Sequence, residues 1–189
     1  FLMGSAGTGK SRTIRSFVGT LREKAILSWE AQIERLRSEL QRAEGGSESQ
    51  RKKAEEKLKK KVAEMEDAIR YHCLLAAPTG CASFQLKFGA STLHRIFGIP
   101  LAYCGPWPNR QDKRFLKMKT RLTQARLFVM DEMSMIGRQM LGKIEFKVRD
   151  TLGNARGGDG EEVLLGGKDV VVAGDPKQAN PIGDEPLYR

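Results

Sequence analysis

The chain has 189 residues, near the usual size of one domain, and 40% of them are hydrophobic, which is enough for a packed core. Its 33 Lys and Arg residues against 23 Asp and Glu give a formal net charge of +10, which favours a polyanionic partner. Three cysteines without a CxxC pair argue against a disulfide scaffold and against a structural zinc site.

The longest uncharged stretch, residues 71–86, is broken by Pro78 and Gly80 and is shorter than a membrane span needs to be. No signal peptide is visible, so we expect an intracellular protein with no membrane partner. The chain opens on Phe1 rather than Met, and a functional motif begins at Gly4, which predicts a fragment of a longer protein.

The first element is a glycine-rich turn between a strand and a helix. Residues 1–3 predict the end of a buried strand, and residues 12–21 place apolar side chains at helical spacing. Between them the chain reads GSAGTGKS, which fits the pattern GxxxxGK[ST] at every fixed position. The residues that would cradle a nucleotide are Gly4, Ser5, Ala6, Gly7, Thr8, Gly9, Lys10 and Ser11. Backbone N–H groups and the helix end bind phosphate, Lys10 reaches the β/γ-phosphates, and the Ser11 hydroxyl is a Mg²⁺ ligand, so ATP and Mg²⁺ are the expected cofactors.

Residues 22–70 predict an antiparallel helical hairpin, a coiled-coil arm with a glycine turn at 45–47. Its apolar positions recur at intervals of three and four residues: Ile26, Trp29, Ile33, Leu36, Leu40, Ala43, then Ala54, Leu58, Val62, Met65 and Ile69. Two interpretations stay open for the arm. It is a solvated helical pair without a partner, or a projecting arm that contacts nucleic acid or a protein partner, which the basic run at 51–61 favours.

The remaining segments alternate strands with helices, so the fold class is α/β with a parallel sheet flanked by helices. Strands are expected at 73–77, 127–130 and 169–173, helices at 81–87, 91–97, 114–124 and 138–152, and loops at 104–109 and 153–160. In such sheets the ligand lies at the carboxyl ends of the strands.

An acidic pair, Asp131-Glu132, follows the apolar run 127–130 and has the form of a Walker B strand. In this interpretation Asp131 holds Mg²⁺ together with Ser11, and Glu132 is the general base for the attacking water. Without the glycine-rich turn upstream, the pair would equally fit a helix N-terminus. Gln178, after the third strand, supplies an amide where a γ-phosphate could be sensed.

Five ordered motifs resemble the Pif-one-like DNA helicases, the RecD-related branch of superfamily 1B. They are GSAGTGKS, APTGCAS (77–83), STLHRIFGI (91–99), VMDEMSM (129–135) and GGKDVVVAGDPKQ (166–178). The resemblance implies a RecA-like P-loop NTPase domain, here residues 1–21 and 71–189, truncated at both ends, with 22–70 as an insertion. It also implies ATP-driven 5′-to-3′ movement on single-stranded DNA, and a motif III strand between the strands of motifs I and II.

The same resemblance assigns roles to single residues. Lys10, Glu132 and Gln178 become the catalytic group, with Gln178 coupling nucleotide to DNA. Pro78, Thr79, Thr92 and His94 would line the DNA side, although a helix-capping or core role explains His94 equally well.

A basic run at 110–126, preceded by Trp107, combines positive charge with an aromatic ring, as single-strand binders do. A surface loop followed by a solvated helix face would give the same pattern. Both interpretations stay open.

The chain departs from the family pattern at three points. Motif III continues as Gln178-Ala-Asn-Pro181 where the family has Gln-Leu-Pro-Pro, the 22–70 hairpin lies outside the common core, and the second motor domain with its arginine finger is absent. The family implies work in DNA repair, recombination or telomere maintenance, in the nucleus or mitochondrion if the source is eukaryotic. Alternatives are a nucleotide-gated DNA-binding or scaffold module without unwinding activity, and the helicase segment of a relaxase or mobile-element replication protein.

Overall fold

The computed structural model describes residues 1–43, 45–100 and 110–188. A five-stranded parallel sheet forms its centre, in the order β1-β7-β4-β2-β3. The strands are β1 (Leu2–Met3), β2 (Cys73–Ala77), β3 (Ser91–Thr92), β4 (Leu127–Met130) and β7 (Asp169–Gly174). Every residue of β2 and β4 is buried, as continuous apolar runs in a parallel sheet should be. Strand β7 lies between β1 and β4, which is the order that the family resemblance implies.

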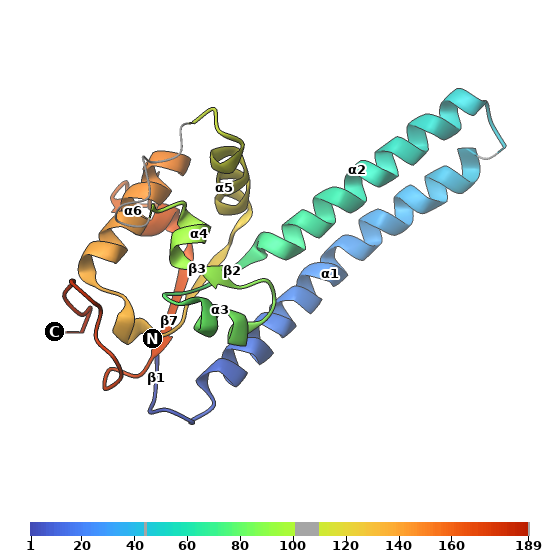
Figure 1. The fold of residues 1–189 in the computed structure, drawn as a ribbon. Helices are drawn as coiled ribbons and strands as arrows, with labels where there is room; N and C mark the ends of the chain where they lie inside the picture. The colour runs from blue at the N-terminus through green and yellow to red at the C-terminus, as the bar shows by residue number, and fades with distance from the viewer. Residues whose placement is uncertain (44, 101–109, 189) are drawn as a thin grey trace.

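Helices cover both faces of this sheet (Figure 1). Alternate residues of β2 point to opposite faces, so Leu75 packs with Ile14 and Val18 of α1 (Lys10–Ala43) and with α3 (Gly80–Leu86). Leu74 points the other way, into a larger core that includes Phe97 and Phe128. That core is closed by α4 (Leu93–Phe97), α5 (Lys113–Gln124) and α6 (Arg138–Leu152). The two layers hold the carboxyl ends of the strands at one edge of the molecule.

A long helical hairpin projects from this α/β body (Figure 1). Helix α1 runs without a break from the glycine-rich turn to Ala43, and α2 (Glu48–His72) returns alongside it. Ser47 and Gln50 form a capping box that starts α2. The regularly spaced apolar residues of the hairpin are buried or half-buried from Trp29 onward, while Ile26 is more exposed. The boundary expected between residues 21 and 22 therefore lies inside one continuous helix.

Three local expectations differ from the structure. Residues 153–160 are not all loop, because β5 (Ala155–Arg156) pairs with β6 (Glu162–Val163) around a glycine turn, ahead of the short helix η2 (Leu164–Gly167). Residues 91–97 begin with two strand residues before the helix. Strand β1 lies at the edge of the sheet, so Met3 is 60% exposed rather than buried. The loop expected at 104–109 lies outside the described residues.

Candidate nucleotide site

The glycine-rich turn connects the end of β1 to the start of α1. Gly7 and Gly9 have φ angles of +80° and +86°, a backbone region that a side chain would strain. The backbone N–H of Gly4 donates to the carbonyl of Gly174 over 3.3 Å, which ties the turn to β7. With α1 beginning at Lys10, the positive end of a long helix points at the centre of the turn, the arrangement that binds phosphate groups.

The Lys10 ammonium lies back over this turn. Its Nζ donates to the carbonyl oxygens of Gly4 and Ser5, at 2.5 and 2.9 Å. A nucleotide phosphate offers the same ammonium stronger, charge-assisted partners than these two carbonyls. The lysine therefore sits within reach of the space that a bound phosphate would take.

Ser11 and Asp131 come together where α1 meets β4. The Ser11 hydroxyl donates to Asp131 Oδ2 over 3.3 Å, and Asp131 is 4% exposed at the end of β4. Magnesium prefers a hydroxyl or one or two carboxylates together with phosphate oxygens and waters, rather than a cage made of protein alone. The described residues contain no group of three or more His, Cys, Asp or Glu able to enclose a metal. Ser11 and Asp131 therefore fit Mg²⁺ held jointly with a nucleotide.

Glu132 follows directly, in a strained backbone conformation. Its φ of 56° is rare for a residue with a side chain, and its N–H donates to Asp131 Oδ1 over 2.9 Å. Burial raises the pKa of Glu132, the negative charges of Asp131 and Asp175 raise it further, and the Lys10 ammonium counteracts them. A carboxylate with a raised pKa beside a phosphate-binding turn is suited to accept a proton.

Glu132 and Gln178 line one pocket of about 390 Å³, together with Thr79. The two residues meet because the end of β7 lies close to the segment after β4. A Cβ on Gly174 would be only 2.6 Å from the backbone nitrogen of Met133. Ser134, in the short helix η1 (Met133–Met135), lines the pocket as well; it is fully buried, and its hydroxyl has no hydrogen-bond partner among the described residues. Ser134 was not among the residues predicted from the sequence, although it is the only hydroxyl residue in VMDEMSM.

The residues expected on the DNA side divide into two places. Pro78 and Thr79 follow β2, and the Thr79 hydroxyl caps α3 by accepting from Ala82 N at 3.2 Å. Thr92 caps α4 in the same way. His94 is half-buried and lines a separate groove at the sheet edge, where burial and Lys143 lower its pKa. Trp107 lies outside the described residues.

No helix in the described part of the chain is both long and apolar enough to cross a membrane.

Comparison with known proteins identifies the family. A family model described as PIF1-like helicase matches residues 57–187, which is more than half of the chain. The structure resembles that of Pif1 helicase from Candida albicans, with a TM-score of 0.60 and 26% sequence identity over 96% of this chain and 30% of that one. It also resembles Pif1 helicase from Bacteroides in complex with ADP-AlF3 and ssDNA, with a TM-score of 0.55 and 22% identity over 96% of this chain and 29% of that one. No curated protein matches the sequence. The chain thus spans under a third of these solved chains, and it belongs to the PIF1-like helicase family.

Proposed function

We propose that this chain is the nucleotide-binding part of an ATP-dependent DNA helicase motor that moves 5′ to 3′ on single-stranded DNA. The contact between Ser11 and Asp131 carries the proposal, because it joins the two motifs that hold the metal and the phosphates of ATP. Family membership supports the helicase class, and the Bacteroides relative was solved with ADP-AlF3 and ssDNA.

Each residue of the site has a distinct task in this proposal. The turn from Gly4 to Gly9 binds the phosphates through backbone N–H groups, and Lys10 offsets their charge. Ser11 and Asp131 hold Mg²⁺, which neutralises charge on the phosphates when bound. Glu132 accepts the proton of the attacking water.

Gln178 links this chemistry to DNA in our proposal. It lines the same pocket as Glu132 and as Thr79, the residue that caps α3 just after β2 on the expected DNA side. A side chain that contacts the γ-phosphate can therefore shift when the phosphate leaves and move its neighbours. The arginine that stabilises the transferred phosphoryl group would come from a second motor domain.

Nucleotide-dependent DNA affinity tests the proposal. Binding of a labelled single-stranded oligonucleotide is measured by fluorescence anisotropy with and without Mg-ATP, in Glu132→Gln to suppress hydrolysis. We expect ATP to change the DNA affinity, and Gln178→Ala to abolish that change while ATP still binds. Gln85→Ala, in the same pocket, is the matched control. If the DNA affinity of the Glu132→Gln protein with Gln178 intact is the same with and without Mg-ATP, the coupling is contradicted.

The cellular setting follows from the same family relationship. We propose an intracellular protein acting in DNA repair, recombination or telomere maintenance, in the nucleus or mitochondrion if the source is eukaryotic. The helical arm is a candidate docking element for a protein partner.

A further inference from the structure

Asp184 fastens the C-terminal part of the described chain to the start of helix α6. Its Oδ1 accepts from the backbone nitrogen of Gln139 at 3.0 Å and from that of Glu185 at 2.8 Å. Its Oδ2 accepts from the backbone nitrogen of Met140 at 3.0 Å. Gln139 and Met140 lie in the first turn of α6, and Gly137, the residue before the helix, has no side chain to cap it. Asp184 therefore caps α6 from a distant part of the sequence.

The residues on either side of Asp184 strengthen this attachment. The backbone nitrogen of Arg138 donates to the carbonyl of Glu185 at 2.8 Å, and the two side chains form an ion pair at 3.0 Å. Gly137 forms an antiparallel bridge with Pro186, and a Cβ on Gly137 would overlap the Asp184 side chain. The start of α6 is thus shaped around Asp184. We call the contacts between residues 184–186 and 137–140 the Asp184 clasp.

The charge of Asp184 suits these donors. Burial alone would raise the pKa of Asp184, but the backbone N–H groups of Gln139, Met140 and Glu185, together with the Lys143 ammonium, lower it overall. The positive end of α6 favours a negative charge at the same place. At neutral pH the clasp is therefore held by charge-assisted hydrogen bonds, which are stronger than bonds between neutral groups.

Two short segments lead to the clasp, one from each side of the candidate nucleotide pocket. One segment runs from Glu132 through η1 to Gly137, and the other runs from Gln178 to Asp184. Glu132 and Gln178, at the far ends of these segments, line the same pocket. The clasp therefore closes a loop of backbone whose two sides carry the proposed general base and the residue proposed to contact the γ-phosphate.

The segment that carries Gln178 depends on its attachments at both ends. Before it, the Asp175 carbonyl accepts from the backbone nitrogen of Gln178 at 3.1 Å. Beyond it, four of the five residues 179–183 are exposed, and the Tyr188 hydroxyl donates to Asn180 Oδ1 at 3.0 Å. This is also the stretch in which motif III departs from the family pattern. The next attachment of the backbone to the body of the protein is the clasp.

We propose that Asp184 is a positioning residue for Gln178, fixing the path of the segment that presents the Gln178 amide to the pocket beside Glu132. This inference rests on the role proposed above for Gln178. Asp184 does not line the pocket, so it acts only through the backbone. A misplacement of about 1 Å can slow a reaction by about 10²-fold, so loss of the clasp should slow hydrolysis while the phosphate-binding turn stays intact.

The single-turnover hydrolysis rate at saturating Mg-ATP and the affinity for Mg-ATP, measured on the full chain, separate positioning from binding. Asp184→Ala should lower the rate by about 10- to 100-fold and leave the affinity unchanged. Asp184→Asn keeps one acceptor oxygen but turns an amide toward Met140, so its rate should be intermediate. Asp112→Ala is the matched control. Asp112 caps α5 by accepting from the backbone nitrogen of Arg114 at 2.8 Å, so this variant loses a similar cap elsewhere and should hydrolyse ATP as wild type does.

A double-mutant cycle ties the effect to Gln178. If Asp184 acts through Gln178, the variant that combines Asp184→Ala with Gln178→Ala should be no slower than Gln178→Ala alone. Losses that multiply in the double variant would overturn the proposal. If Asp184→Ala does not fold by circular dichroism, Gly137→Ala takes its place, because the added Cβ displaces the Asp184 side chain.

The single variants separate a failure of this inference from a failure of the proposed function. A slow Gln178→Ala together with an unchanged Asp184→Ala would overturn the positioning role and leave the role of Gln178 standing. An unchanged Gln178→Ala would overturn the role of Gln178 and the positioning role with it. Equal slowing by Asp184→Ala and Asp112→Ala would mean that general loss of stability is the cause, which also overturns the proposal.

Discussion

Ser11 and Asp131 are 120 positions apart in the sequence, yet the hydroxyl of one donates to the carboxylate of the other over 3.3 Å. The contact exists because β1 and β4 flank β7 in a parallel sheet, so the helix after β1 starts beside the end of β4. Two motifs that are separate in sequence thus form one site.

Magnesium dependence should follow these two residues. Ser11→Ala removes the hydroxyl ligand, so ATP binding should need at least about tenfold more Mg²⁺. Ser16→Ala, an exposed serine on the same helix, should behave as wild type. Titrating Mg²⁺ at fixed ATP measures the effect, and identical Mg²⁺ curves for both variants would remove Ser11 from the metal site.

Hydrolysis should depend on Glu132 and on pH. Glu132→Gln should retain ATP binding but lower the single-turnover hydrolysis rate by about 10²–10⁴-fold, the usual contribution of a general base. In wild type the rate should fall as pH drops through the raised pKa of Glu132, because the protonated carboxyl cannot accept a proton. A rate that stays high in the Gln variant would exclude Glu132 as the base.

The same carboxylate should make the fold less stable at neutral pH. Because the pKa of Glu132 is raised in the folded chain, its contribution favours folding at acidic pH, below the ordinary Glu pKa, and is lost as pH rises through the folded value. Glu132→Gln should therefore raise the Tm at neutral pH, and the gain should shrink at acidic pH. The exposed Glu161→Gln controls for loss of one charge. A lower Tm at neutral pH would be the contrary result.

Two glycines should respond oppositely to alanine. Gly174→Ala would place a Cβ 2.6 Å from the backbone nitrogen of Met133, so the end of β7 and η1 must move apart and stability should fall. Gly142→Ala, inside α6 with open space around it, should raise stability by about 0.5–1 kcal/mol. Urea unfolding of both variants checks this, and equal effects would contradict the close approach of β7 to η1.

The helical arm should unfold when an acidic residue is placed between its two helices. Ile33 is 5% exposed between α1 and α2, so Ile33→Asp buries a carboxylate and should lower helicity in circular dichroism. Val62→Asp should have a smaller effect, because Val62 is only half-buried. Gln32 precedes Ile33 on the exposed side of α1, so Gln32→Asp should have little effect. We expect ATP binding to survive, and its loss would show that arm and nucleotide site fold as one unit.

The sequence was most informative where chemistry demands fixed residues. The glycine-rich turn and the acidic pair could be placed because phosphate binding and metal binding need particular residue types at particular spacing. The central strands were predicted from continuous apolar runs. For these elements, the apolar runs and the motif residues both indicate the same α/β arrangement.

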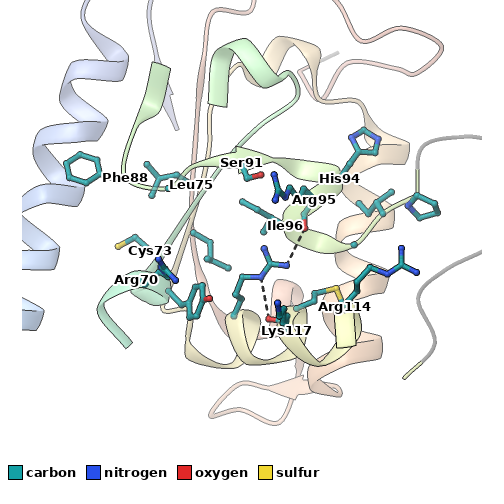
Figure 2. Close-up of a pocket in the computed structure, with 18 residues that line it drawn as sticks. Arg70, Cys73, Leu75, Phe88, Ser91, His94, Arg95, Ile96, Arg114 and Lys117 are labelled. Atoms are coloured by element: carbon teal, nitrogen blue, oxygen red, sulfur yellow. Dashed lines mark hydrogen bonds between the residues drawn. The ribbon is translucent and has the colours of Figure 1, made fainter. Parts of the chain in front are cut away.

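Other features depend on contacts between segments that are far apart in the sequence, and no local residue pattern predicts such contacts. The groove beside the two-residue strand β3 brings together Arg70, Arg95 and three residues of α5, which lie far apart in the sequence (Figure 2). Strands β5 and β6 have two residues each, so they are too short to show an alternation of polar and apolar residues. Ser134 became notable only when its hydroxyl proved to be buried beside Glu132 and Gln178.

Isothermal titration of Mg-ATP into wild type and Lys10→Ala tests the central claim most directly. Lys10 supplies the charged hydrogen bond to the phosphates, worth about 1.5–3 kcal/mol, so the variant should bind roughly 10- to 150-fold more weakly. Lys24→Ala, an exposed lysine further along α1, should bind as wild type does. Superimposable titrations of wild type and Lys10→Ala would contradict a phosphate-binding role for the glycine-rich turn.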